Sequence, residues 1–546
     1  MMTVGAPISC RGHSWIRGQD SWTAIPALHG AGLTKGKSPE RGDAIMTDEA
    51  NIFALQAAMN VGRLTARQLT ERYLARIDQI DRRGPRLNAV IEINPDALAI
   101  ADALDAERQE RGPRGPLHGI PILLKDNIDT GDRMQTTAGS LALVGASAPR
   151  DAFIAARLRA AGAVILGKTN LSEWANFRSD HSTSGWSSRG GLTRNPYALD
   201  RSPCGSSSGS GVAVAADLCV AAIGTETDGS ITCPASVNGI VGIKPTVGLA
   251  SRSGIVPIAH SQDTAGPMAR SVADAAILLG ALTGVDDEDP ATAASANQTY
   301  SDYTQFLDAD GLRGARLGVL RSACARHPHA LAILETTLAA LRRLGAEIVD
   351  PIEIPSLTQI ERSELVVLLY EFKADLNAYL AAREDTVAVH SLEEVIAFNA
   401  RERARVMPYF GQEIMERAQA MGSLDSPEYA AARAQCLRLA RAEGIDAALN
   451  AHCLDAIIAI TRSPAWPIDL VNGDPPGGCG CSSLAAVAGY PHLTVPAGFV
   501  FGLPVGLSFF GGAWQEPTLI RLAYAFEQGT RLRRPPRFLP TADLTA

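Results

Sequence analysis

The residues with the clearest chemical potential in this sequence are serines set among glycines. Residues 205–211 read GSSSGSG, and a second turn, Asp228-Gly229-Ser230, places Ser230 24 residues after Ser206. Glycine-rich turns let backbone N–H groups approach a developing negative charge, and a serine held there is a candidate nucleophile. A second serine can pass the nucleophile's proton onward, because a hydroxyl both donates and accepts hydrogen bonds. The block therefore predicts catalysis by a serine nucleophile.

A serine nucleophile needs a base, and the histidines do not offer an obvious one. The ten histidines are scattered and form no HExxH-like spacing, so each is interpreted as a structural or surface residue. Lysine can serve instead if burial lowers its pKa by roughly three units from about 10.4. Lys125, Lys168 and Lys244 each follow an apolar segment. Spacing alone does not choose among the three.

Two further motif matches are interpreted as coincidences. Residues 162–169, GAVILGKT, fit the P-loop expression, but residues 163–166 read as a buried strand rather than as a phosphate cradle. Residues 205–209 fit the G-x-S-x-G nucleophile elbow, which requires a strand directly before it. The preceding segment contains Pro196 and Pro203 and cannot be a central strand. A Ser-His-Asp esterase is kept as an alternative.

Composition excludes several classes of protein. The 546 residues are 46% hydrophobic with a formal charge of −8, so there is no basic footprint for nucleic acid, and no apolar stretch is long enough to span a membrane. The nine cysteines are odd in number and lack zinc-like spacing, which predicts reduced thiols, no metal and a cytoplasmic location. Cys479-Gly480-Cys481 could hold a metal only with partners elsewhere. Residues 1–45 read as a poorly ordered extension, with Met46 a candidate start.

The elements that must position the serines and lysines alternate between strand and helix. Helical periodicity covers most of residues 49–111, around a strand at 87–93, and helices are predicted at 151–161, 271–283 and 329–344. Strands are predicted at residues 119–124, 163–166, 241–243, 316–320, 347–349, 456–460 and 493–495. This alternation predicts one large α/β domain over residues 46–546, with a sheet covered on both faces. A helical excursion is expected at about residues 360–448.

Several of these segments together resemble the amidase signature hydrolases. The matching blocks are GIPILLKDNI (119–128), GKTNLSEWANFRS (167–179), CGSSSGSG (204–211), GTETDGSI (224–231) and GIVGIKPTVGL (239–249). The resemblance covers about residues 60–530, with a signature core at about 119–283. It implies a single α/β/α domain with a central mixed sheet, and a Ser–Ser–Lys triad that needs no metal or cofactor.

Carried over by position, the resemblance gives each site residue a role. Lys125 matches the family's base, Ser206 its bridging serine with a preceding cis peptide bond, and Ser230 its acylated nucleophile. The oxyanion is expected to lie against the backbone N–H groups of Thr227, Asp228, Gly229 and Ser230. The implied reaction is hydrolysis of an amide through an acyl-enzyme.

The sequence departs from the commonest family pattern around both serines. Cys204 and Ser208 stand at usual glycine positions, Glu226 replaces an aspartate and Asp228 replaces a glycine. These variants resemble the bacterial peptide amidase branch, which releases ammonia from C-terminally amidated peptides. We hypothesise that Asp228 repels a free carboxylate and tolerates a neutral carboxamide. The residues expected to contact the substrate are Ser207, Asp228, Trp186, Phe177 and Trp466.

Other functions remain open at this level. Within the family, the runner-up is an aryl or alkyl acylamidase that acts on xenobiotic amides or anilides. Another class is a glutaminase like the ammonia-producing subunit of glutamyl-tRNA amidotransferase, but Thr232 stands where that role would favour an arginine. A non-catalytic binding protein is disfavoured because all three triad positions are filled. We expect a monomer or homodimer with an amide substrate and no nucleic-acid or membrane partner.

Overall fold

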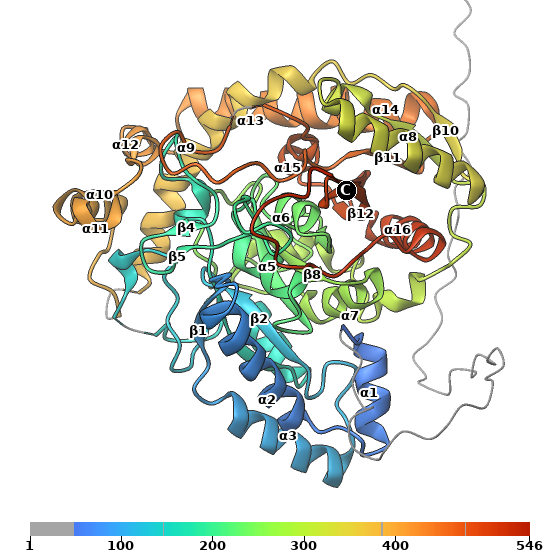
Figure 1. The fold of residues 1–546 in the computed structure, drawn as a ribbon. Helices are drawn as coiled ribbons and strands as arrows, with labels where there is room; N and C mark the ends of the chain where they lie inside the picture. Colours follow the sequence, from blue (N-terminus) through green and yellow to red (C-terminus); the bar gives the residue numbers. More distant parts are fainter. Residues whose placement is uncertain (1–48, 146, 384–385, 476, 546) are drawn as a thin grey trace, which may run out of the picture. The chain divides into compact units, whose positions relative to one another are not determined.

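A computed structural model describes residues 49–145, 147–383, 386–475 and 477–545 (Figure 1). Within it, Asp48–Ala546 form one compact unit. The extension expected at residues 1–45 and the candidate start at Met46 lie outside the described residues. No helix in the described ranges combines the length and the apolarity needed to cross a membrane.

An eleven-stranded mixed sheet forms the centre of this unit. Its strand order is β1-β3-β2-β6-β8-β7-β12-β13-β11-β9-β10, and a separate two-stranded sheet pairs β4 with β5. The strands are β1 (Val90–Ile93), β2 (Pro121–Lys125), β3 (Val164–Thr169), β4 (Trp186–Ser187), β5 (Gly191–Leu192), β6 (Ala221–Glu226), β7 (Val241–Lys244), β8 (Thr264–Ala269), β9 (Arg316–Val319), β10 (Glu347–Val349), β11 (Ala456–Ile460), β12 (His492–Val500) and β13 (Leu503–Phe510). Strand β2 runs parallel to β3 and β6, whereas β8 is antiparallel to β6 and β7.

Helices flank the sheet. The α-helices are α1 (Ile52–Asn60), α2 (Ala66–Arg76), α3 (Ala97–Arg111), α4 (Phe153–Ala160), α5 (Ser208–Ala215), α6 (Thr232–Val237), α7 (Val272–Leu282), α8 (Pro328–Arg343), α9 (Leu357–Ala381), α10 (Leu392–Arg401), α11 (Arg403–Val406), α12 (Glu413–Gln419), α13 (Pro427–Leu437), α14 (Asp446–His452), α15 (Ser482–Ala488) and α16 (Glu516–Thr530). Every residue of β2, β3, β6, β8, β11 and β13 is buried. Continuous burial along a strand requires cover on both faces, so the predicted α/β/α architecture is confirmed.

Local signals in the sequence produce several of these elements. Thr65 and Gln68 form the predicted capping box at the start of α2, and Ser271 caps α7 by accepting from the N–H of Asp274. The P-loop match is excluded, because Lys168 and its neighbours lie inside the buried strand β3. The expected helical excursion is present as α9 to α14, and α9 packs against α12 and α13.

The prediction that the cysteines are reduced was wrong for four of them. Disulfide bonds join Cys204 to Cys233 and Cys324 to Cys479, pairs that are 29 and 155 residues apart. Such separations carry no signal in the sequence, because only the fold brings the partners together. Cys479 is therefore not available as a metal ligand beside Cys481. The prediction of a cytoplasmic location was argued from reduced thiols, and the two disulfides remove that argument.

Candidate active site

The end of strand β2 places Lys125 in the interior of the molecule. Its side chain is fully buried, and Nζ donates hydrogen bonds to Ser206 Oγ at 2.7 Å and to Thr225 Oγ1 at 2.8 Å. A third, longer bond of 3.2 Å reaches the carbonyl oxygen of Thr225 on the neighbouring strand β6. The candidate base and the candidate relay serine are thus in direct contact.

The surroundings of Lys125 favour its neutral form. Burial lowers the pKa of the Lys125 ammonium to about 7, against the opposing influence of Asp263 and Glu226. Asp126, its neighbour in sequence, points elsewhere and forms an ion pair with Arg189. A buried lysine with this pKa is partly neutral at physiological pH and can accept a proton.

The other two candidate lysines are also fully buried but contact different groups. Lys168 Nζ donates to the carbonyl oxygen of Ile128 at 2.7 Å, and Lys244 Nζ donates to that of Pro245 at 3.1 Å. Neither bonds to a serine among the described residues. Geometry therefore separates Lys125 from Lys168 and Lys244, which spacing alone could not do.

Ser206 lies in the tight loop that leads into helix α5. The Gly205–Ser206 peptide bond is cis, as the family resemblance implied. Gly205 is required by close packing, because a Cβ there would lie 2.2 Å from Ser172 Oγ. No strand leads directly into this loop in the described chain, since the nearest one, β5, ends at Leu192. The nucleophile-elbow interpretation of Ser207 is thereby excluded.

Ser207 connects the loop that contains Ser206 to strand β6 and to the Ser230 turn. Its hydroxyl donates to the carbonyl oxygen of Thr225 at 3.0 Å and accepts from the N–H of Thr225 at 3.2 Å. Its own N–H donates to the carbonyl oxygen of Ser230 at 3.1 Å. The side chain is fully buried, so its expected contact with the substrate has no support in this geometry, and its role here is to hold the two serine segments together.

Ser230 lies in the turn between strand β6 and helix α6. Gly229 has a φ of +78°, a conformation that glycine adopts without strain. The carboxylate of Glu226 spans the turn, with Oε2 accepting from the N–H groups of Ile231 at 2.7 Å and Thr232 at 2.9 Å. The unusual glutamate at this position therefore fixes the far side of the nucleophile turn.

The turn presents a set of unused backbone donors. Among the residues that the structure describes, no hydrogen bond uses the N–H of Thr227, Asp228, Gly229 or Ser230, or the hydroxyl of Ser230. Ser230 is 8% exposed, so an incoming group can reach it. Unpartnered N–H groups beside an accessible hydroxyl are the arrangement that stabilises an oxyanion.

Asp228 is held by groups that come from distant parts of the chain. Its Oδ2 accepts from Ser483 Oγ at 2.7 Å, and its charge acts on the buried carboxyl of Glu364 on α9. Burial, followed by the charge of Asp228, raises the pKa of Glu364 well above its usual value, which favours the protonated form of this carboxyl. Gln262 Nε2 joins Glu364 to the carbonyl oxygen of Thr227. Nothing in the sequence pointed to Glu364 or Gln262.

A cavity of about 190 Å³ adjoins the nucleophile turn. Its walls include Asp228 and Gly229 from the turn, and Arg462, Trp466 and Asp474 from the segment that follows β11. Of the three aromatic residues expected to contact the substrate, Trp466 lines this cavity. The position of the cavity beside the unused N–H groups makes it the candidate substrate site.

The other two aromatic residues pack into the protein. Phe177 lies edge-on against Phe372 with ring centroids 5.0 Å apart. Trp186 lies edge-on against Phe410 at 5.2 Å. Both are buried and neither lines the 190 Å³ cavity. Their expected role as substrate contacts therefore finds no support in this geometry.

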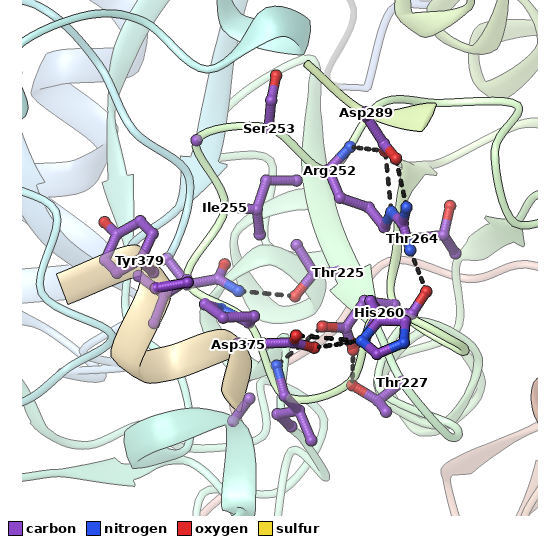
Figure 2. A pocket seen from close by; sticks show the side chains of 18 of the residues that line it. Thr225, Thr227, Arg252, Ser253, Ile255, His260, Thr264, Asp289, Asp375 and Tyr379 are labelled. Atoms are coloured by element: carbon purple, nitrogen blue, oxygen red, sulfur yellow. Dashed lines mark hydrogen bonds and ion pairs between the residues drawn. The ribbon is translucent and has the colours of Figure 1, made fainter. Parts of the chain in front are cut away.

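A second cavity, of about 350 Å³, lies next to the same strand end. Figure 2 shows Thr225 and Thr227 in its wall, with His260 beside Asp375. Thr225 Oγ1, which binds Lys125 Nζ, also accepts from Asn127 Nδ2 at 3.0 Å in this wall. The larger cavity is thus one hydrogen bond away from the candidate base.

One side-chain cluster near this cavity has the composition of a metal site. His260, Glu371 and Asp375 offer ligand atoms that lie within 4.8 Å of one another. Each is already engaged: His260 Nδ1 contacts Asp375 at 2.9 Å, and Glu371 accepts from Tyr429 Oη at 2.7 Å. These bonds account for the cluster without an ion.

The Cys204–Cys233 disulfide joins the two serine-bearing segments, and its removal has an expected cost. A Cys204→Ser, Cys233→Ser variant should lose about 2–4 kcal/mol of unfolding free energy, because the bond constrains a long loop of the unfolded chain. Urea denaturation of both proteins under oxidising conditions measures the difference. Equal stability of the two, in oxidant and in reductant, would show that these cysteines are not bonded.

Comparison with known proteins gives consistent matches over most of the chain. A family model described as Amidase matches residues 68–520. The X-ray structure of native peptide amidase from Stenotrophomonas maltophilia superposes with a TM-score of 0.86 at 55% identity, covering 90% of this chain and 99% of that one.

Two curated relatives extend the comparison. A probable amidase of Arabidopsis thaliana is 44% identical over 501 residues, covering 90% of this chain and 92% of the relative. A glutamyl-tRNA(Gln) amidotransferase subunit from Halorhodospira halophila is 37% identical over 495 residues, covering 88% of this chain and 97% of the relative. The similarity therefore includes both simple amidases and a component of a transferase.

Proposed function

The chain belongs to the amidase family of amide-hydrolysing enzymes, and we propose that it cleaves a primary carboxamide through an acyl-enzyme on Ser230. Ser206 relays protons and neutral Lys125 is the base. The observation that carries this proposal is the 2.7 Å hydrogen bond from the buried, pKa-lowered Lys125 to Ser206. The residue after Ser206 connects the two serine segments, because the N–H of Ser207 donates to the carbonyl oxygen of Ser230.

The proposed reaction has two halves. Ser230 Oγ attacks the amide carbon while its proton passes to Ser206 Oγ, whose own proton passes to Lys125 Nζ. The tetrahedral intermediate collapses when Lys125 returns the proton through Ser206 to the nitrogen, and ammonia leaves. Water then attacks the acyl-enzyme with the same relay accepting its proton, which releases the carboxylic acid and frees Ser230.

The backbone of the nucleophile turn stabilises the charge that develops on the carbonyl oxygen. The N–H groups of Thr227 to Ser230 are free to donate, and a preorganised donor of this kind is commonly worth about 3–4 kcal/mol. Glu226, through the N–H groups of Ile231 and Thr232, and Ser483, through Asp228, hold the turn in place before substrate arrives. The turn can therefore stabilise the oxyanion without changing its own conformation during the reaction.

The substrate is proposed to be a C-terminally amidated peptide or an amino acid amide. Similarity to a peptide amidase at 55% identity supports this class. So does Asp228 in the wall of the cavity, because its negative charge disfavours a carboxylate product or competitor and tolerates a neutral carboxamide. The enzyme would act as a monomer or homodimer, and an aryl or alkyl acylamidase is the alternative within the family.

A glutaminase like the amidotransferase relative is the second candidate, favoured by the 37% identity. Against it, Thr232 occupies the position where we expected an arginine, and its N–H is bonded to Glu226 at 2.9 Å. The two candidates differ in substrate. Glutamine carries a free carboxylate, whereas a peptide amide does not.

Ammonia release from a substrate panel tests the proposal. The panel holds N-acylated amino acid amides, free amino acid amides, anilides, glutamine and amides that carry a carboxylate. N-acylated amino acid amides should give the highest kcat/KM, followed by free amino acid amides. A strong preference for glutamine or for acidic amides would contradict the proposed substrate class, and fastest turnover of anilides would favour the acylamidase.

A further inference from the structure

The candidate substrate cavity contains an arginine without an ion-pair partner. Arg462 follows strand β11 and lines the cavity with Asp228 and Gly229. Its Nε is buried and has no hydrogen-bond partner in the described parts of the chain, and no ion pair there involves its guanidinium. Buried cationic donors are normally satisfied, because leaving them unpaired is costly. An incoming group that accepts hydrogen bonds would remove this cost.

Neighbouring residues hold this guanidinium in place. It lies over the ring of Trp466, with Cζ 5.3 Å from the ring centroid. Trp466 is itself fixed, because its Nε1 donates to Asp474 Oδ1 at 2.9 Å and Asp474 Oδ2 accepts from the N–H of Ser184 at 3.1 Å. The backbone of Arg462 pairs with that of Gly480. The side chain is therefore presented to the cavity rather than left to move with solvent.

The charges in the cavity indicate which acceptor suits Arg462. Burial lowers the Arg462 pKa, while Asp474 and Asp228 act in the opposite direction; an arginine remains charged in proteins. A carboxylate on the substrate would be attracted by Arg462. It would also be repelled by Asp228 and Asp474, which line the same cavity. A neutral carbonyl oxygen accepts from the guanidinium without adding a negative charge.

We propose that Arg462 donates a hydrogen bond to a neutral carbonyl oxygen in the acyl portion of the substrate, namely the carbonyl that precedes the amidated residue. This inference rests on the proposed function, since ammonia as the leaving group is too small to fill the cavity beside Gly229 and leaves it to the acyl portion. Arg462 thereby selects peptide amides and N-acylamino acid amides over amides that lack a second carbonyl group. It is a specificity residue and takes no part in proton transfer.

Arg462→Met tests this assignment with two matched substrates. N-acetylleucinamide has the second carbonyl, whereas isocaproamide keeps the leucine side chain and lacks the acetylamino group. The variant should lose about ten- to a hundredfold in kcat/KM for N-acetylleucinamide, largely through KM, because a hydrogen bond to a charged donor is removed. Turnover of isocaproamide should change by less than about threefold. Arg417→Met, at an exposed arginine paired with Asp180, is the matched control and should behave like the wild type.

The outcomes separate this inference from the proposed function. Equal losses for both substrates would overturn it, because they would indicate a structural role for Arg462, and so would unchanged kinetics. A larger loss for glutaric acid monoamide than for N-acetylleucinamide would assign Arg462 to a carboxylate instead. Failure of the wild-type enzyme to release ammonia from any amide would overturn the proposed function, whereas an active wild type with any Arg462 result leaves it standing.

Discussion

Replacement of Ser230 by alanine should reduce amide hydrolysis by at least about 10⁴-fold while leaving the fold intact. The loss is large because the variant lacks the atom that forms the acyl-enzyme, and members of a catalytic unit each carry most of its effect. The hydroxyl of Ser230 makes no hydrogen bond among the described residues, so its removal leaves no buried partner unsatisfied. Ammonia release and the thermal melting curve measure the two halves of this prediction.

Ser210→Ala is a matched control for Ser230→Ala within the serine-rich block. The Ser210 hydroxyl bonds to the carbonyl oxygen of Ile223 at 3.2 Å and lies 2.7 Å from Thr169 Oγ1. In the described chain, the Ser210 hydroxyl makes no hydrogen bond to Lys125, Ser206 or Ser230, so its loss should cost some stability and less than about tenfold in rate. Appreciable activity of Ser230→Ala would assign the nucleophile to another residue. A mass increase equal to the acyl group, seen on the wild type and absent from Ser230→Ala, would identify the acylated residue directly.

The fold was predictable where local pattern and burial agree. The apolar run that ends at Lys125 became β2, and the alternation of strands and helices gave the layered sheet. Strand β8 was not predicted, because TAGPMA has small residues and a proline and little strand propensity. It is a strand because β6 and β7 lie on either side of it, with Pro267 opposite Ile223. Tertiary context overrides propensity there.

The candidate site was predictable only for the residues that carry a local motif. Lys125, Ser206 and Ser230 belong to recognisable blocks, and the structure brings the first two into contact. Glu364 and Arg462 come from segments more than 130 residues beyond the nucleophile turn and match no motif. Their importance depends on which groups lie near them in the folded chain, and a single sequence does not reveal those contacts.

The rate of the enzyme should depend on pH through Lys125. Burial lowers the Lys125 pKa to about 7, and only the neutral amine can accept a proton. The value of kcat/KM should therefore be constant above about pH 8 and fall tenfold per unit below about pH 6, because kcat/KM reports groups of the free enzyme. Lys125→Arg should lose at least about 10³-fold, since arginine keeps a donor to Ser206 but cannot act as a base.

A second titrating group makes this pH profile a sharper test. Burial also raises the pKa of Asp263 to about 6, and Asp263 accepts a hydrogen bond from Thr227 Oγ1 in the nucleophile turn. If Lys125 is the base, Asp263→Asn should keep the acid limb and move it to lower pH, because the Asp263 charge favours protonated Lys125. If the limb instead reports ionisation of Asp263, the same variant should lose the limb altogether. The direction of change in one variant thus distinguishes a lysine base from a carboxylate that merely positions the turn.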